Sequence, residues 1–266
     1  MKSLFVIKIG GNVIDNDAAL ASFLDRLASL KSAWILVHGG GKLATELSAR
    51  LGIETQMVEG RRVTDQATLD VVTMVYGGLV NKRIVAALQA RGLNALGLTG
   101  ADGDCIRARK REHPTTDYGF VGDVERVGVE RLLSLIQSGF LPVIAPLSHD
   151  GQGIMLNTNA DTIASEVASA LASYRIAESA VHLVYCFEKQ GVLRDVEDET
   201  SVISRITAHD YEGLREQGII AKGMIPKMDN AFAALRRSVS SVVITNADSI
   251  GRLEQDDIGG TRIVLS

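Results

Sequence analysis

The stretch that decides the fold is residues 4–51, which read LFVIKIGGNVIDNDAALASFLDRLASLKSAWILVHGGGKLATELSARL. Two apolar runs, at residues 4–9 and 33–37, are typical of buried strands. An amphipathic helical pattern follows each run, at residues 18–30 and 42–51. This β-α-β-α order predicts an α/β fold, in which helices cover both faces of a mainly parallel sheet.

The remainder of the chain continues this alternation, with a change of character in the middle. Asp65 is placed to cap a long helix that runs toward Arg91, where Gly92 would end it. Glycines, aspartates and short alternating segments at residues 102–127 and 146–156 indicate inserted β-hairpins. We further predict helices at residues 129–138, 160–171, 209–217 and 226–237, and strands at residues 141–145, 180–186, 242–245 and 262–265.

The composition is that of an ordinary globular protein, with 266 residues, 46% of them hydrophobic and 23% charged. A net charge of −4 gives no basic footprint for nucleic acid, and no run approaches the roughly 18 apolar residues of a membrane span. The basic run at residues 107–111 holds no aromatic residue, which favours a solvated hairpin or loop. Cys105 and Cys186 lack metal-ligand spacing to a histidine, so we expect no metal centre. By elimination of a signal peptide and a membrane span, we expect a reducing, cytoplasmic compartment.

Two glycine turns stand at the ends of the first two predicted strands. One is KIGG at residues 8–11, and the other is HGGG at residues 38–41. Because ligands bind beyond the carboxyl ends of parallel strands, both turns are expected to face one crevice. Glycine lets backbone N–H groups approach an anion, and Lys8 adds a positive charge. We therefore predict a phosphate site, although neither turn matches a P-loop or a dinucleotide fingerprint.

Three further polar motifs are candidates, and each has a plainer alternative. In NTNAD at residues 157–161, an extended backbone would place three polar side chains on one face, although a helix N-cap would explain one of them. In GMIPK at residues 223–227, Lys227 would oppose the helix dipole, which points weakly to function over an exposed surface lysine. In GRRVTD at residues 60–65, an arginine before the long helix is suited to a carboxylate, although most such arginines are surface residues.

These five motifs, in this order along residues 4–265, resemble the amino acid kinase family, and within it the members that phosphorylate N-acylated glutamate. The resemblance implies a three-layer α/β/α sandwich around a mainly parallel central sheet with inserted β-hairpins. Residues 1–175 would form an N-terminal lobe that binds the acyl amino acid and forms a homodimer, and residues 176–266 a C-terminal lobe that binds ATP. The implied reaction is phosphorylation of the γ-carboxylate of N-acetyl-L-glutamate, with ATP and Mg²⁺, in arginine or ornithine biosynthesis.

The resemblance also implies roles for single residues. Lys8 and Lys227 would neutralise charge on the migrating phosphoryl group, and Asp161 would orient both lysines. The attacking carboxylate is already ionised, so no general base is required. Substrate contacts would come from the backbone of Gly11, Gly40 and Gly41 and from Arg62, Asn157 and Asn159, with Arg62 and Asn157 at the α-carboxylate. Nucleotide contacts would come from Gly10, Glu188, Gly191, Leu193, Ile219, Ile220 and Met224.

The chain departs from the family pattern in the nucleotide lobe. Phe187 and Glu188 stand where a hydroxyl residue and an aspartate are usual, and AK at residues 221–222 replaces a polar-acidic pair. Two alternatives stay open: N-succinyl-L-glutamate as the substrate, with Arg61 as the additional cation, or a non-catalytic amino-acid sensor on the same fold. The chain starts directly at its first strand, without the extra helix of arginine-inhibited hexamers, so we expect an arginine-insensitive homodimer.

Overall fold

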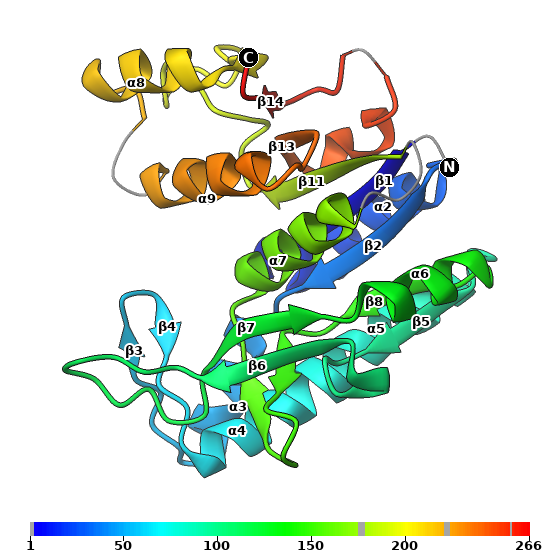
Figure 1. Ribbon diagram of the computed structural model, residues 1–266, viewed down its shortest axis with the longest axis vertical. Helices are drawn as coiled ribbons and strands as arrows, with labels where there is room; N and C mark the ends of the chain where they lie inside the picture. The colour runs from blue at the N-terminus through cyan, green and yellow to red at the C-terminus, as the bar shows by residue number, and fades with distance from the viewer. Residues whose placement is uncertain (1–2, 175–178, 221–223, 256) are drawn as a thin grey trace.

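The computed structural model describes residues 3–174, 179–220, 224–255 and 257–266. At its centre lies an eight-stranded sheet in the order β12-β14-β13-β11-β1-β2-β8-β5 (Figure 1). Neighbouring strands run parallel except β13 and β14, which are antiparallel. The strands are β1 (Ser3–Ile9), β2 (Ala33–His38), β5 (Ala95–Leu98), β8 (Leu141–Ile144), β11 (Ala180–Phe187), β12 (Arg205–Ile206), β13 (Ser241–Asn246) and β14 (Thr261–Ile263). The predicted mainly parallel sheet is confirmed.

Helices cover both faces of this sheet, which confirms the three-layer sandwich. Successive side chains of a strand point to opposite faces. Leu4 and Val6 of β1 therefore enter one core with α6, α7, α8 and α9, and Phe5, Ile7 and Ile9 enter a second core with α2 and the long helix. The helices are α1 (Gly11–Ile14), α2 (Asp17–Ala28), α3 (Gly41–Arg50), α4 (Gln66–Val72), the π-helical η1 (Thr73–Val80), α5 (Asn81–Gln89), α6 (Val129–Gln137), α7 (Ala160–Ser173), α8 (Ala208–Glu216) and α9 (Ile225–Arg236), with 3₁₀ turns η2 (Asp102–Asp104) and η3 (Ala247–Arg252).

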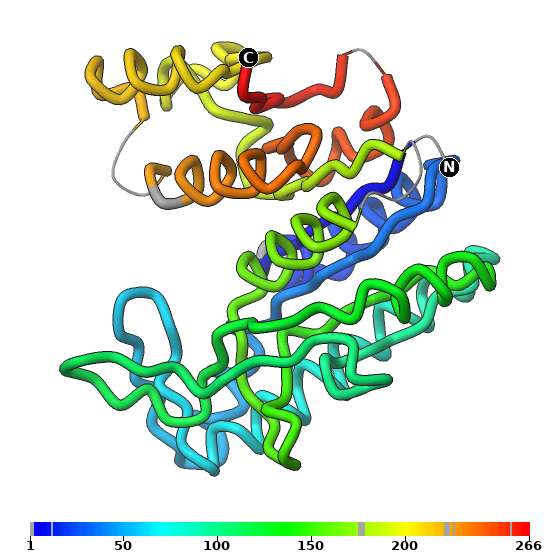
Figure 2. Tube along the Cα trace, viewed as in Figure 1, coloured from blue at the N-terminus to red at the C-terminus, as the bar shows by residue number. Residues whose placement is uncertain are grey.

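Two parts of the chain share the central sheet. Residues up to 174 supply β1, β2, β5 and β8, and residues from 180 onward supply β11 to β14. In Figure 2 the cyan-to-green part and the yellow-to-red part occupy opposite ends of the molecule. The predicted boundary between residues 175 and 176 lies outside the described residues, so the division into two lobes stays a prediction.

The predicted helix from Asp65 toward Arg91 is present, as α4, η1 and α5 run on over Gln66–Gln89. Asp65 accepts a hydrogen bond from the Thr68 backbone N–H (2.8 Å), and Gly92 follows the helix with a φ of 75°. The π-helical centre of this helix was not predicted. A π-helical turn changes the direction in which side chains point, but the amino-acid composition does not reveal it. By length and composition alone this helix could cross a membrane, and 44% of its apolar window is buried inside the protein.

The two predicted hairpin regions combine into one four-stranded sheet in the order β10-β9-β6-β7. Short elements escaped prediction, namely β5, β12 and the hairpin of β3 and β4, because two to four residues carry too little alternation. The strands outside the central sheet are β3 (Met57–Val58), β4 (Arg61–Arg62), β6 (Ile106–Lys110), β7 (Gly122–Val127), β9 (Leu147–His149) and β10 (Met155–Asn157). Residues 107–110 of the basic run therefore lie on β6, within a hairpin, and Arg111 directly follows the strand.

Of the two alternatives for residues 157–161, the structure shows the helix N-cap and not an extended backbone, and α7 begins at Ala160, where the helix was predicted to start. Asn157 ends β10, whereas Asn159 caps α7 and Asp161 lies in the first turn of that helix. The Asn159 side chain accepts a hydrogen bond from the backbone N–H of Thr162 at 3.0 Å. This cap satisfies a donor that the helix leaves free, which favours an early start of the helix over an extended strand.

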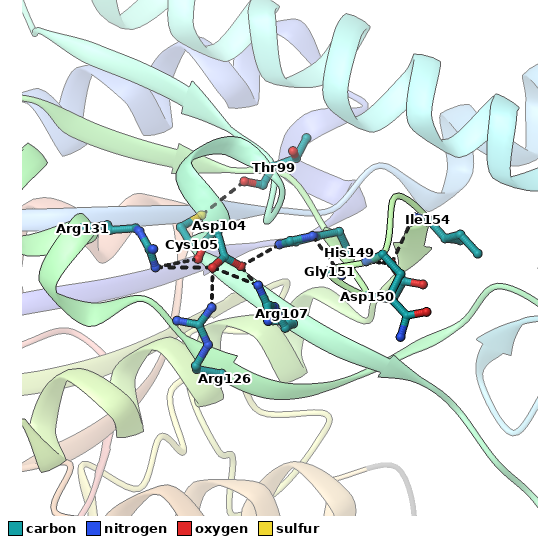
Figure 3. A network of polar contacts seen from close by, with 11 residues as sticks. Thr99, Asp104, Cys105, Arg107, Arg126, Arg131, His149, Asp150, Gly151 and Ile154 are labelled. Atoms are coloured by element: carbon teal, nitrogen blue, oxygen red, sulfur yellow. Dashed lines mark hydrogen bonds and ion pairs between the residues drawn. The ribbon is translucent and has the colours of Figure 1, made fainter.

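A polar network holds the hairpin sheet together around Asp104 (Figure 3). Arg107 (3.1 Å), Arg126, Arg131 (3.5 Å) and His149 (2.9 Å) all contact its carboxylate. Burial would raise the pKa of Asp104, but the bond and charge of Arg126, the charge of Arg107 and the bond to His149 lower it to about 2. One carboxylate thus links β6, β7, α6 and β9.

We expect Asp104→Asn to lower the free energy of unfolding at pH 7. The folded-state pKa of Asp104, about 2, lies below its usual 3.8, so this stabilisation is complete above about pH 4 and is lost as the pH falls toward 2. The gap between wild type and variant in urea unfolding should narrow over that range. Asp17→Asn, which breaks an exposed pair with Arg83, is the control and should change little. A gap independent of pH would contradict this account.

Candidate active site

Lys8 lies on the face of β1 that α7 covers, because its neighbours Ile7 and Ile9 enter the opposite core. The first turn of α7 carries Asp161 to the same place. The two side chains form an ion pair in which Lys8 Nζ lies 2.9 Å from Asp161 Oδ1. The Lys8 side chain is only 11% exposed and that of Asp161 is 32% exposed. The pair therefore lies at the carboxyl end of β1 with limited access to solvent.

Lys227 reaches the same point from α9, in the other part of the chain. Its Nζ lies 3.7 Å from the centre of the Phe187 ring, and Lys8 Nζ lies 5.7 Å from the same centre. Burial lowers the pKa of Lys227, Asp161 opposes this effect, and the charge of Lys8 adds to it. The structure therefore brings Lys8, Lys227 and Asp161 together, across more than 200 residues of sequence.

A cavity of about 380 Å³ opens beside the Phe187 ring, and we name it the Phe187 cavity. Its volume is within the range of about 300–1,000 Å³ that small-molecule sites have. Burial raises the pKa of Cys186 to about 12, so this thiol lines the cavity as a neutral group. The predicted site residues in its wall are Gly10, Gly11, Glu188, Gly191, Met224 and Lys227.

A second pocket of about 180 Å³ lies at the second glycine turn, and we name it the Arg62 pocket. The two glycine turns are neighbours, because the Gly39 backbone N–H donates to the Ile9 carbonyl at 3.0 Å. The pocket and the Phe187 cavity therefore adjoin at the carboxyl ends of β1 and β2. The predicted site residues in the wall of the Arg62 pocket are Gly40, Gly41, Arg62, Asn157 and Asn159.

The guanidinium group of Arg62 is buried and held by three acceptors of the protein. Its Nη1 donates to Thr55 Oγ1 (3.0 Å), and its Nη2 donates to the Gly41 carbonyl (2.9 Å) and to Thr45 Oγ1 (2.7 Å). Both hydrogens of Nη2 are thus used inside the protein. The bonds orient the guanidinium plane in the pocket wall before any ligand arrives.

Asn157 and Asn159 line the same pocket as Arg62, and their side-chain amides make different hydrogen bonds. Asn157 Nδ2 donates to Thr64 Oγ1 (3.0 Å) through one of its two N–H bonds, so its second N–H can still donate to a ligand. Asn159 Oδ1 caps α7, so its amide nitrogen is the group that can still donate to a ligand. The start of α7 therefore adds the positive end of a 14-residue helix to the pocket.

A second guanidinium group, that of Arg61, also lines the Arg62 pocket. Burial lowers the pKa of Arg61, and the like charge of Arg111 lowers it further, while Asp123 opposes both. Asp123 is already engaged, because its carboxylate pairs with Arg111 at 2.6 Å. The pocket wall thus carries two cationic side chains, which suits a ligand with more than one negative group.

Some predicted residues lie apart from both spaces, and one contact was missed. Leu193, Ile219 and Ile220 are not in either wall, since Ile220 is buried in the core and Leu193 bridges to Val202, so their nucleotide contacts stay predictions. Residues 221–223, with the departure at 221–222 and Gly223 of the GMIPK motif, lie outside the described residues. Sequence reasoning missed Tyr76, which η1 brings to the Arg62 pocket.

Comparison with known proteins agrees with this geometry. Residues 3–246 match the profile of the Amino acid kinase family. The chain belongs to the amino acid kinase family. Within that family, acetylglutamate kinase of Cytophaga hutchinsonii is 57% identical over 100% of both chains, and acetylglutamate kinase of Bacteroides thetaiotaomicron is 56% identical over 98% of each. A solved structure from Streptococcus mutans superposes with a TM-score of 0.78, at 27% identity and over 100% of both chains. The family predicted from the five motifs is confirmed.

The glycine turn of the Arg62 pocket makes a matched pair of variants informative. Gly40 has a φ of 147°, and a Cβ there would lie 3.0 Å from the Tyr76 ring. Gly41 has open space around its Cα and begins α3. We expect Gly40→Ala to lower the melting temperature, because it strains the backbone and displaces Tyr76, and Gly41→Ala to leave it unchanged or raise it. Equal melting temperatures of the two variants would contradict this reading of the turn.

Proposed function

We propose that this chain transfers the γ-phosphoryl group of ATP to the γ-carboxylate of N-acetyl-L-glutamate, as a step of arginine biosynthesis. Relatives that are 56% and 57% identical, over at least 98% of either chain, carry the name acetylglutamate kinase. The observation that carries the proposal is the meeting of Lys8 and Asp161 with Lys227, which lines the Phe187 cavity. Two ammonium groups at such a point suit a PO₃ unit that passes between two anions.

The chemistry requires positioning and charge neutralisation rather than proton transfer. A glutamate side chain has a pKa of about 4.3, so the acceptor is a carboxylate at neutral pH and needs no general base. Its oxygen forms a bond to the γ-phosphorus while the bond to the ADP oxygen breaks, which yields an acyl phosphate and ADP. Lys8 and Lys227 would stabilise the charge on the phosphoryl oxygens during this transfer. Asp161 would hold the ammonium groups in place and would not act as a base.

The two reactants would occupy the two adjoining spaces. ATP would bind in the Phe187 cavity, with the first glycine turn at its phosphates and the segment after β11 near the base and ribose. The acyl-glutamate would bind in the Arg62 pocket, with its α-carboxylate at Arg62 and Asn157. The γ-carboxylate would then point toward Lys8 and the neighbouring glycine turns.

Mg²⁺ fits this site as a partner of the nucleotide. The described residues hold no group of three or more His, Cys, Asp or Glu side chains that could bind a metal ion unaided. Mg²⁺ commonly keeps several waters and is held by substrate phosphates together with one or two carboxylates. Asp161 and Glu188, the carboxylates that act on Lys227, would hold its water shell. When bound, the ion would neutralise charge on the β- and γ-phosphates.

We also propose a homodimer and a cytoplasmic location. Met74 and Leu79 on the long helix are 54% and 49% exposed, and a second copy would cover such apolar side chains. Cys105 and Cys186 are both free and buried, which fits a reducing compartment.

We expect Lys8→Ala and Lys227→Ala each to lower kcat by about 10²–10³-fold, because each removes one positive contact to the phosphoryl group. Turnover is measured as hydroxamate formation from N-acetyl-L-glutamate and ATP. Lys31→Ala is the matched control, because Lys31 is exposed and lies just before the amino-terminal end of β2, whereas the site lies at the carboxyl ends of the strands. Wild-type turnover in either lysine variant would refute the site. Absence of turnover in the wild type would favour the amino-acid sensor.

One observation favours a second candidate substrate, N-succinyl-L-glutamate, whose acyl group carries an additional carboxylate. Arg61 lines the Arg62 pocket, and Asp123, the carboxylate that acts on it, is paired with Arg111. We expect the wild type to have the higher kcat/KM with N-acetyl-L-glutamate, and Arg61→Ala to lower any turnover of the succinyl compound more than that of the acetyl compound. A clear succinyl preference in the wild type would overturn acetyl as the acyl group.

A further inference from the structure

His38 is a buried, hydrogen-bonded histidine that the phosphoryl-transfer scheme does not use. It is the last residue of β2 and directly precedes the glycines of the Arg62 pocket. Its side chain has no exposure to solvent, and its Nδ1 lies 2.7 Å from the Gly39 carbonyl oxygen. Its other ring nitrogen, Nε2, lies 3.1 Å from Asn81 Nδ2 at the start of α5.

These contacts select one tautomer of the imidazole ring. The Gly39 carbonyl can only accept, so Nδ1 of His38 carries the proton and Nε2 accepts from Asn81. The second N–H of Asn81 donates to the Val143 carbonyl (2.9 Å), and the Asn81 oxygen accepts from Lys82 Nζ (3.1 Å). Rotating the Asn81 amide by half a turn would break all three bonds. The assignment of the ring proton is therefore tied to the backbone of β8 and to Lys82.

The bond from His38 fixes the plane of the peptide between Gly39 and Gly40. The peptide bonds of the described residues are trans, so the Gly40 N–H points away from the Gly39 carbonyl and from His38. Gly40 is buried and lines the Arg62 pocket, and its N–H donates to no acceptor among the described residues. A buried backbone donor without a partner is costly and rare. A ligand in the pocket is the partner that would satisfy it.

We propose that His38 and Asn81 act as a positioning pair, which locks the Gly39–Gly40 peptide so that the Gly40 N–H donates to an oxygen of the transferred phosphoryl group. This inference rests on the phosphoryl transfer proposed above. Without the lock, the peptide can rotate and turn the Gly39 carbonyl into the pocket, where its negative end would repel that oxygen. The Tyr76 ring lies against Gly40 and limits the space for this rotation. His38 transfers no proton, since its ring is enclosed by protein.

Two substitutions of His38 separate the hydrogen bond from the bulk of the ring. His38→Leu removes the donor, whereas His38→Asn keeps an N–H at the place of Nδ1. We expect kcat of His38→Leu to fall toward the roughly 10²-fold loss that follows removal of an oxyanion donor. We expect His38→Asn to keep most of the turnover. The change in kcat should exceed the change in KM for N-acetyl-L-glutamate, because the contacts of Arg62 and Asn157 to the α-carboxylate are untouched. Unchanged kcat in His38→Leu, or an equal loss in both variants, would overturn the proposal.

His182, a part-buried and hydrogen-bonded histidine, provides a control for the loss of an imidazole ring away from the site. It lies on β11, its Nδ1 contacts Ser241 Oγ at 2.8 Å, and it lines neither space. His182→Leu should lower the melting temperature without lowering kcat. If it lowers kcat as strongly as His38→Leu, the effect is general destabilisation and the proposal fails.

The tautomer can be tested in the unmodified protein, without a turnover assay. Long-range ¹⁵N–¹H spectra of ¹⁵N-histidine-labelled protein should show the His38 proton on Nδ1. Burial lowers the pKa of His38 to about 4, so this signal should not titrate between pH 8 and about pH 5. A proton on Nε2, or titration near pH 6.5, would overturn the positioning role. If the wild type fails to phosphorylate N-acetyl-L-glutamate, the proposed function fails while these spectra still decide the state of His38.

Discussion

The contact between Lys8 and Asp161 joins a central strand to the helix that covers it, and the candidate site is assembled around this contact. Alternation along β1 sends Leu4 and Val6 into the core beneath α7 and leaves Lys8 at the end of the same face. The cap at Asn159 starts α7 early enough for Asp161 to meet the lysine in the first helical turn. The aliphatic core thereby determines the position of the charged pair, because neither element can shift without exposing apolar side chains.

Phe187 supplies an aromatic partner to both lysines of the site. Lys8 pairs with Asp161, the charges of Asp161 and Glu188 act on Lys227, and both ammonium groups lie over the Phe187 ring. An aromatic ring offers a weak, non-ionic partner to an ammonium group, and such a partner is readily exchanged for a phosphate oxygen. Phe187 looked like a departure from the family pattern when only the sequence was considered. In the structure the Phe187 ring lies beneath both lysines, where it is a cation–π partner for their ammonium groups.

The long regular elements could be predicted from the sequence, whereas features that depend on contacts between distant residues could not. β1, β2 and α2 are long enough for their periodicity to be read, and Asp65 carried a recognisable cap signal. The lysines were found because their motifs and the family resemblance agreed. Tyr76 at the Arg62 pocket depends on a π-helical register, and the charged neighbours of Arg61 include Asp123 on β7 and Arg111 in the segment between β6 and β7. Such contacts have no local signature.

The position of β1 within the sheet has a consequence for how the chain folds. β1 precedes the other strands of the central sheet along the described chain, yet one of its two neighbours is β11, whose residues 180–187 come far later. Seven residue pairs along this border join segments that are more than 170 residues apart. Until the ribosome has released most of the chain, one edge of the innermost strand has no hydrogen-bonding partner, and an exposed edge invites pairing with other chains. Closing so large a loop is slow, so the pairing of β1 with β11 at the centre of the sheet is completed late in folding.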